Sequence, residues 1–333
     1  MKLGLYTITY LGLWYRGAAL TLEQIIERAR SYGYIGIEID GKRPHGNPLD
    51  LPARRCLELR RRADESGVEI YAVAANNDFS SPIPEHRECQ LAYVRELIRM
   101  TADLGAPVLR LFAAWPGVTQ SPDGGRYDVA RRIWAVTHDE VPREQTWDAC
   151  RSALAEAARW AGDHGVTLAL QNHPPIVDSG EDMLRMIREV NSPFLKACLD
   201  APLAKKQGAS DMRQAVHAVG SLQVLSHFGG EYEQDADGAV RGYVRHSDGS
   251  LVPENFYGEF IRGLQEIGYK GYLGYELCHP LPKVDGQTVG IEFADKNARL
   301  AADYMRGLMG LGRAADRLSH ESDASTRNFS IPS

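Results

Sequence analysis

The stretch HGVTLALQNHPP, residues 164–175, contains the pattern from which the fold can be predicted. A glycine ends a polar, helix-like segment, a short apolar run typical of a buried strand follows, and two carboxamides, an imidazole and two prolines close it. The same order of helical segment, glycine and apolar run recurs at SGVEI (66–70), LGAPVL (104–109) and IGYKGYLG (267–274). A repeated alternation of helix and strand predicts a parallel sheet covered by helices.

Eight apolar or β-branched runs are predicted to form strands. They are KLGLY (2–6), IGIEI (35–39), EIYAVA (69–74), VLRLFA (108–113), TLALQ (167–171), LKACLD (195–200), LQVLSHF (222–228) and YLGYE (272–276). Eight βα units without a change of composition between them predict an α/β fold, a single (β/α)8 TIM barrel over residues 1–312, followed by a polar C-terminal tail at 313–333. A doubly wound sheet is the alternative, but the first predicted strand lacks the glycine-rich phosphate turn that such a fold uses.

Two connections in this alternation are too long for simple loops. Residues 114–142 follow the fourth predicted strand, and residues 229–253 follow the seventh. Loops longer than about 12–15 residues usually form lids, binding loops or partner surfaces. Because both follow strands, we expect them on the catalytic face of the barrel, where the carboxyl ends of the strands meet.

The composition excludes several classes of protein. The chain has a net charge of −6 and a pI near 6.0, which argues against nucleic-acid binding because that function needs a basic face. No apolar run reaches the roughly 18 residues that cross a bilayer, so we expect no membrane partner. The five cysteines are dispersed and form no CxxC pair, which predicts reduced thiols in a cytoplasmic protein.

Polar side chains stand at the ends of the last four predicted strands, in the order Gln171, Asp200, His227 and Glu276. In a barrel such positions point toward a common centre. Carboxylate and carboxamide oxygens favour Mg²⁺ or Mn²⁺, and the single imidazole makes Mn²⁺ our preferred ion, with Mg²⁺, Co²⁺ or Zn²⁺ as alternatives. We therefore predict that these four residues bind one divalent metal ion. The alternative is four separate polar strand ends, each satisfied by hydrogen bonds.

Five stretches give the chain a resemblance to a known family. They are GYIGIEI (33–39), GVTLALQNH (165–173), KACLDAP (196–202), LSHFGG (225–230) and GYLGYEL (271–277). In these the chain resembles the xylose isomerase-like barrels, which include sugar isomerases, epimerases and dehydratases and endonuclease IV. The resemblance implies a metal set of Glu, Asp, His and Glu. Its last three members fall on Asp200, His227 and Glu276, whereas the first falls on Gln171 and departs from the family's glutamate.

This departure changes the expected chemistry. Gln171 can offer an oxygen to a metal, but it cannot accept a proton. His173 shares a strand face with Gln171, so we predict that its imidazole acts as acid or base beside the metal. Glu276 is the second predicted catalytic residue, in addition to its role as a ligand. The alternative for His173 is an imidazole that is merely hydrogen-bonded within the loop.

One histidine, one carboxylate and a Lewis-acidic metal suit β-elimination from a sugar next to a carbonyl. Here the chain resembles the larger subunit of bacterial C-glycoside deglycosidases, metal-dependent lyases that act on 3-oxo-glycosides. That resemblance implies a sugar or glycoside substrate, a smaller β-rich partner subunit and a higher oligomer. The alternative is a ketose isomerase or 3-epimerase acting through a metal-bound enediolate. An endonuclease IV-like nuclease would need a multi-zinc cluster with more histidines, and a metal-free binding barrel is the third class.

Further positions are predicted to contact the substrate. Glu38 and Asn76, at or just past the ends of the second and third strands, are expected to bind sugar hydroxyls. Trp115, after the fourth strand, is expected to form an apolar platform for a sugar or aromatic aglycone. His279 lies three residues past Glu276 and is expected to touch a sugar hydroxyl. Arg110, inside a strand, is interpreted as one half of an ion pair in the barrel interior.

Overall fold

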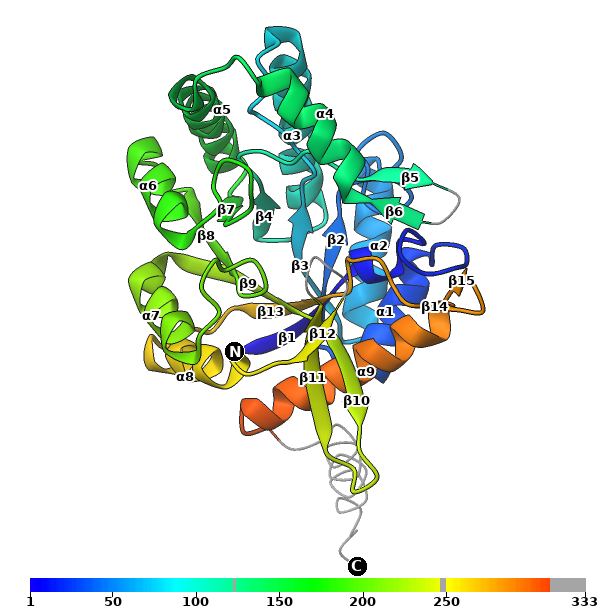
Figure 1. Ribbon diagram of the computed structural model, residues 1–333. Coiled ribbons are helices and arrows are strands. Elements are labelled where there is room, and N and C mark those ends of the chain that lie inside the picture. Colours follow the sequence, from blue (N-terminus) through cyan, green and yellow to red (C-terminus); the bar gives the residue numbers. More distant parts are fainter. Residues whose placement is uncertain (122–123, 246–249, 312–333) are drawn as a thin grey trace, which may run out of the picture.

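The protein is described by a computed structural model, which covers residues 1–121, 124–245 and 250–311. Eight parallel strands close into a barrel in the order β1-β13-β9-β8-β7-β4-β3-β2 (Figure 1). The predicted TIM barrel is therefore confirmed. The predicted polar tail at 313–333 lies outside the described residues.

The barrel strands agree with the predicted runs to within one or two residues. They are β1 (Lys2–Tyr6), β2 (Gly36–Asp40), β3 (Glu69–Ala74), β4 (Val108–Leu111), β7 (Thr167–Gln171), β8 (Leu195–Asp200), β9 (Gln223–Gly229) and β13 (Tyr272–Glu276). Nearly every position in these strands is buried. Both faces are covered, one by the barrel interior and the other by the helices, and this explains the continuous apolar runs in the sequence.

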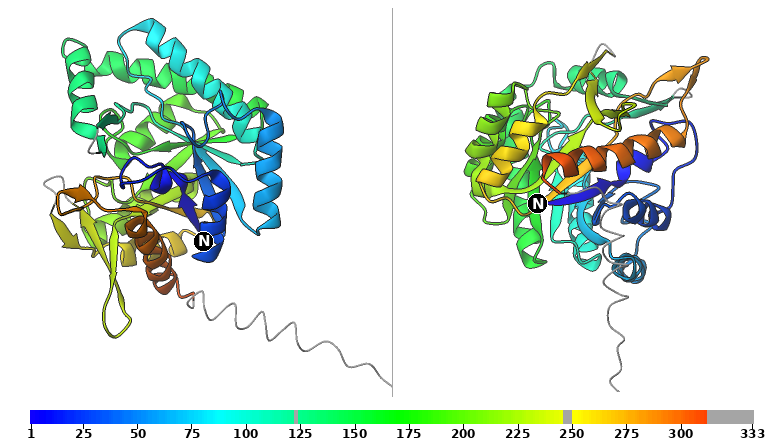
Figure 2. Two further views of the ribbon diagram at one scale, coloured as in Figure 1. Left: turned by 90° about the vertical axis from the view of Figure 1, so that its right-hand side faces the viewer. Right: turned by 90° about the horizontal axis from the view of Figure 1, so that it is seen from below.

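Helices surround the barrel, as the ribbon views show from three sides (Figures 1 and 2). They are α1 (Leu22–Ser31), α2 (Ala53–Glu65), α3 (Pro84–Asp103), α4 (Tyr127–His138), α5 (Arg143–Asp163), α6 (Gly180–Val190), α7 (Ala209–Val219), α8 (Tyr257–Glu266), α9 (Ile291–Leu308) and the short 3-10 helices η1 (Thr7–Tyr10) and η2 (Gly220–Leu222). The first α-helix begins at a capping box in which Thr21 and Gln24 satisfy each other's backbone amides. Within the described ranges, no helix is both long and apolar enough to cross a membrane.

The two long connections contain secondary structure of their own. After β4 the chain forms the hairpin β5 (Thr119–Ser121) and β6 (Gly124–Arg126), followed by α4. After β9 it forms an antiparallel sheet of β10 (Glu231–Gln234), β11 (Val240–Arg245) and β12 (Leu251–Pro253), whose β10–β11 hairpin extends away from the barrel (Figure 1). A last small hairpin, β14 (Lys283–Val284) and β15 (Gln287–Thr288), follows β13. The sequence predicted loops here because most of these strands have only two to four residues. All five cysteines are free thiols, as predicted.

Two stacked tyrosines form the floor beneath the site. The rings of Tyr71 and Tyr272 lie 4.0 Å apart at an angle of 8°. They fit because the neighbouring strands carry glycine: a Cβ atom on Gly4 would lie 2.2 Å from the Tyr71 ring, and one on Gly36 would lie 2.7 Å from the Tyr272 ring. Gly274 similarly leaves room for the Tyr71 hydroxyl and for a ring carbon of His227. The glycines of the barrel strands therefore make room for the two tyrosine rings inside the barrel.

We expect Gly4→Ala to destabilise the fold because its methyl group would overlap a ring that is held from the other side by a stacked partner. The expected loss in the free energy of unfolding is about 1–3 kcal/mol, the usual effect of overpacking a core. The measurement is urea denaturation. Gly307→Ala is the matched control, since a Cβ atom at this exposed helical position meets no atom within 4 Å. It should raise stability by up to about 1 kcal/mol, and equal effects of the two changes would contradict the packing role of Gly4.

Candidate metal centre and active site

Three side chains from adjacent strands lie together at the carboxyl end of the barrel. Asp200 ends β8, His227 lies in β9 and Glu276 ends β13, and one potential ligand atom from each lies within 4.8 Å of the others. The parallel register explains this, because Asp200 pairs with His227 while Glu276 pairs with Gly229, two residues further along β9. His227 Nδ1 lies 3.8 Å from Asp200 Oδ2 and 3.9 Å from Glu276 Oε2. These three of the four predicted ligands therefore converge.

The chemistry of this cluster fits a divalent cation. The other ring nitrogen of His227, Nε2, lies 2.7 Å from a carboxylate oxygen of Glu38. Nδ1 is buried and has no hydrogen-bond partner among the described residues, although it faces two carboxylates. A buried nitrogen left without a partner is costly in most settings. A cation between Nδ1 and the carboxylates would satisfy all three groups, with the His227 ring oriented from behind by Glu38.

Without a metal, the cluster must neutralise its own charge. Burial alone would lower the pKa of His227, but the charges of Glu38, Asp200 and Glu276 outweigh it and raise this pKa to about 10. Burial and, next, the charge of Asp200 raise the pKa of Glu276 to about 7. The imidazole is therefore protonated at neutral pH in the metal-free protein, and a metal ion must displace that proton.

Gln171, the fourth predicted ligand, contacts the cluster through its amide nitrogen. Its Nε2 donates to Asp200 Oδ2, and its Oε1 accepts from Arg110 Nη1 at 2.6 Å. Arg110 also donates to Glu38 Oε1 at 2.8 Å. This confirms Arg110 as half of an interior ion pair. The contact between Arg110 and Gln171 was not predicted from the sequence. A charged residue inside an apolar strand needs a buried polar partner, and this requirement was the signal that could have indicated it.

Two predicted sugar-binding residues, Glu38 and Asn76, use their polar side-chain atoms within the protein. Glu38 is completely buried, and its two oxygens are taken by Arg110 and His227. Burial would raise its pKa, but the charges of His227 and Arg110 lower it to about 2. Glu38 is therefore placed behind His227 and not beside a substrate. Asn76 donates to Asp40 at 2.8 Å and accepts from Lys42 at 3.4 Å, so its amide is engaged within the protein.

His173 lies just past the end of β7 and is partly exposed. Its Nδ1 lies 2.5 Å from the carbonyl oxygen of Pro174. Because a carbonyl oxygen only accepts, Nδ1 carries the hydrogen and Nε2 keeps its lone pair. Burial lowers the pKa of His173 to about 4, so the ring is neutral at physiological pH. A neutral ring with an unprotonated Nε2 can accept a proton, and the predicted acid–base role of His173 stays a prediction.

Aromatic rings hold His173 at the edge of a cavity. The rings of Phe112 and Trp115 meet the His173 ring edge-on, with centroids 4.8 and 4.7 Å away. The cavity has a volume of about 360 Å³ and is lined by Trp115, Trp134, Arg131, His173 and neighbouring prolines. Trp115 lines this cavity, and its role as an apolar platform stays a prediction. We call this space the aromatic cavity.

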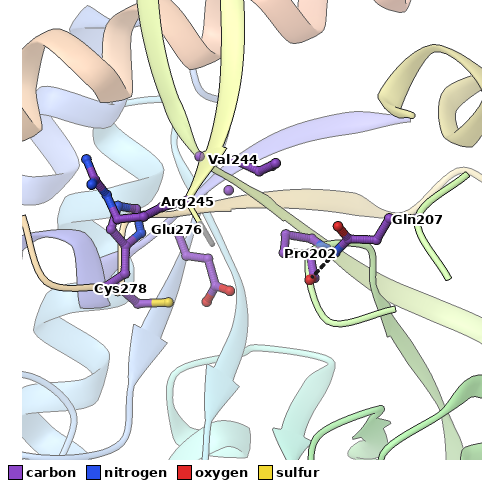
Figure 3. Close-up of a pocket in the computed structure, with 9 residues that line it drawn as sticks. Pro202, Gln207, Val244, Arg245, Glu276 and Cys278 are labelled. Carbon is purple, nitrogen blue, oxygen red and sulfur yellow. Dashed lines mark hydrogen bonds between the residues drawn. The ribbon is translucent and has the colours of Figure 1, made fainter. Parts of the chain in front are cut away.

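A second cavity, of about 230 Å³, is lined by one member of the cluster, Glu276. Figure 3 shows the Glu276 carboxylate pointing into it, between Cys278 on one side and Pro202 and Gln207 on the other. His279 lines the same cavity, and its Nε2 lies 3.0 Å from Glu231. The polar groups of this cavity suit hydroxyl groups of a sugar. We call it the polar cavity.

Comparison with known proteins agrees with this architecture. The chain matches the xylose isomerase-like TIM barrel family over residues 26–306. It is 24% identical over 288 residues to a fructoselysine 3-epimerase of Shigella flexneri, which covers 83% of this chain and 90% of the relative. Similar structures include a D-psicose 3-epimerase from Clostridium cellulolyticum H10 (TM-score 0.67, 17% identity, 93% of this chain and 99% of that one). A 3-keto-D-glucoside 4-epimerase from E. coli is another (TM-score 0.62, 17% identity, 93% and 99%). At these identities the structural likeness shows the fold.

We predict that Mn²⁺ affinity rises with pH. The ion needs a neutral Nδ1, whereas His227 is protonated below its raised pKa of about 10 in the metal-free protein. If binding displaces one proton, the Mn²⁺ affinity rises about tenfold for each unit by which the pH is raised. Isothermal titration calorimetry between about pH 6.5 and 8 measures this dependence. Asp200→Ala, which removes a ligand, should take up no ion in the same titration. A wild-type affinity independent of pH would show that Nδ1 does not bind the metal.

Proposed function

The chain belongs to the xylose isomerase-like TIM barrel family, and on this basis we propose that it is a divalent-metal-dependent carbohydrate enzyme that removes a proton next to a sugar carbonyl. The main support is the convergence of Asp200, His227 and Glu276, together with Nδ1 of His227, which has no hydrogen-bond partner in the described ranges. Mn²⁺ remains our preferred ion because the set combines carboxylate oxygens with one imidazole. When bound, such a cation supplies Lewis-acid stabilisation of negative charge on the carbonyl oxygen.

Glu276 and His173 are the proposed proton-transfer groups. Glu276 points into the polar cavity. His173 presents the unprotonated Nε2 of a neutral ring at the aromatic cavity. One of these groups removes the proton from the carbon next to the carbonyl, and the other holds or supplies a proton elsewhere on the substrate. The sugar would occupy the polar cavity, whose wall includes His279 and Gln207.

Epimerisation is the outcome that the relatives support best. The similar proteins are 3-epimerases of ketose sugars and a 4-epimerase of a 3-keto-glucoside. In this reaction the proton leaves the carbon next to the carbonyl and a proton returns to the opposite face, so no bond between heavy atoms breaks. The substrate class we propose is therefore a ketose or a keto-glycoside.

A second candidate is β-elimination from a 3-oxo-glycoside, and the specific observation in its favour is Gln171. A carboxamide cannot act as an acid or base near neutral pH, so this chain lacks a proton-transfer group at the position where the resemblance implies a glutamate. In elimination the proton leaves the carbon next to the carbonyl, the bond from the adjacent carbon to the aglycone breaks, and a carbon–carbon double bond forms. The aglycone leaves with the electron pair and takes a proton. This candidate also includes the predicted smaller β-rich subunit and higher oligomer.

The two outcomes are separated by one assay in D₂O. The Mn²⁺-loaded chain is incubated with a free ketohexose and with the 4-nitrophenyl glycoside of 3-keto-glucose. An epimerase gives the epimer with deuterium at the inverted carbon and releases no nitrophenol. A lyase releases nitrophenol from the glycoside. We expect deuterium incorporation that depends on the metal. If neither substrate exchanges deuterium or loses its aglycone, the proposed proton removal is contradicted.

We predict that His173→Asn preserves metal binding but abolishes most turnover. The change removes the basic Nε2, and loss of a proton-transfer group typically lowers kcat by about 10²–10⁴-fold. Mn²⁺ affinity should stay within about threefold of wild type, because His173 is not one of the three converging side chains. The matched control is His164→Asn, at an exposed histidine just past the end of α5, which should leave both quantities unchanged. Normal turnover in His173→Asn would refute the acid–base role.

A further inference from the structure

The side-chain amide of Gln171 has a fixed orientation. Its Oε1 accepts from Arg110 Nη1 at 2.6 Å, and its Nε2 donates to Asp200 Oδ2. A guanidinium can only donate and a carboxylate can only accept, so rotating the amide by 180° would oppose like groups on both sides. Gln171 is 3% exposed, which leaves little water to compensate. The amide oxygen therefore points away from the cluster toward Arg110.

Arg110 cannot move away from Gln171 without a large penalty. Its side chain is 2% exposed, and its Nε donates to the completely buried Glu38 at 2.8 Å. The guanidinium also lies 4.9 Å from the ring centroids of both Tyr6 and Phe112. Moving the guanidinium would break a buried ion pair, and removing its acceptor would leave an N–H of a buried cation unpaired.

These hydrogen bonds form one continuous series of side chains, which ends at two of the proposed metal ligands. It runs through Asp200, Gln171, Arg110, Glu38 and His227, which come from the five strands β8, β7, β4, β2 and β9. Both ends face the space in which a cation would lie, since Asp200 Oδ2 and His227 Nδ1 are 3.8 Å apart. Gln171 connects Asp200 to Arg110 in this hydrogen-bond series.

We propose that Gln171 is a positioning residue that holds Asp200, and that the metal ion is bound by three protein side chains, Asp200, His227 and Glu276. This inference rests on the proposed metal-dependent function and corrects the four-ligand set expected from the sequence. For an ion such as Mn²⁺ or Mg²⁺, which prefers about six ligands, one more position is then open to substrate oxygens or water. A substrate with a carbonyl and a neighbouring hydroxyl can use two such positions while a water occupies the third.

The test replaces the amide and counts the water molecules on bound Mn²⁺. Gln171→Met keeps the length of the side chain but removes both hydrogen bonds. We expect the mutant to bind one Mn²⁺ per chain about 10–100-fold more weakly, the usual effect of losing a residue that orients a ligand. The number of exchangeable waters, measured by proton relaxation of the bound Mn²⁺, should be the same as in the wild type. One additional water in Gln171→Met would overturn the proposal, because it would show that a ligand had been lost.

Two further variants serve as controls for this measurement. Glu276→Ala removes a proposed ligand and should gain at least one water if it retains the ion. Gln223→Met changes another buried glutamine of a barrel strand, whose side-chain atoms have no partner among the described residues, and should leave affinity and water number unchanged. The melting temperature of each metal-free protein shows whether it is folded.

A crystal structure of the Mn²⁺-loaded full chain provides a test that needs no variant. We expect Gln171 Oε1 to remain on Arg110. An ion within about 2.5 Å of that oxygen would overturn the proposal. If the wild-type chain bound no Mn²⁺ at all, both the proposal and the metal-dependent function would fail, whereas a lost ligand in Gln171→Met would refute only the role assigned to Gln171.

Discussion

The carboxylate of Glu38 lies between the guanidinium of Arg110 and the imidazole of His227, and the geometry of the site depends on this buried contact. A charge without water must be neutralised by its neighbours. Glu38 accepts from both cations and thereby fixes the plane of the His227 ring. Since Nε2 is used toward Glu38, Nδ1 must face Asp200 and Glu276. The interior ion pair thus determines which nitrogen is available to a metal.

Glu38, Arg110 and His227 belong to a buried polar layer near the carboxyl end of the barrel. Below this layer the interior is filled by the stacked rings of Tyr71 and Tyr272, which need the glycines of β1 and β2. Above it, side chains at the strand ends meet the two cavities. The rings exclude water from below, so the charges of Glu38 and Arg110 interact in a medium of low polarity, where a fully paired network holds its members firmly.

The sequence was sufficient to predict the fold, and it located the converging ligands, because both depend on local patterns. Apolar runs bounded by glycine and helical segments identify barrel strands, and strand ends identify Asp200, His227 and Glu276. Contacts across the barrel were harder to predict. Glu38 and Arg110 are 72 positions apart in the chain, and no local pattern tells whether a carboxylate at a strand end faces solvent or an arginine from another strand. Gln171 was predicted as a ligand from its place at a strand end, whereas its hydrogen-bond partners, Arg110 and Asp200, orient its amide.

The site separates the functions that a family glutamate at position 171 would combine. Such a residue can ligate a metal and move a proton, but Gln171 can do neither while Arg110 holds its oxygen. The proposed function therefore assigns proton transfer to His173, which lines the aromatic cavity. A proton returned by His173 to a sugar carbon gives an epimer, whereas a proton supplied to a departing group in that cavity gives elimination. Under the proposed function, the same pair of residues would serve both reactions, and the substituent that a substrate places beside Trp115 would decide between them.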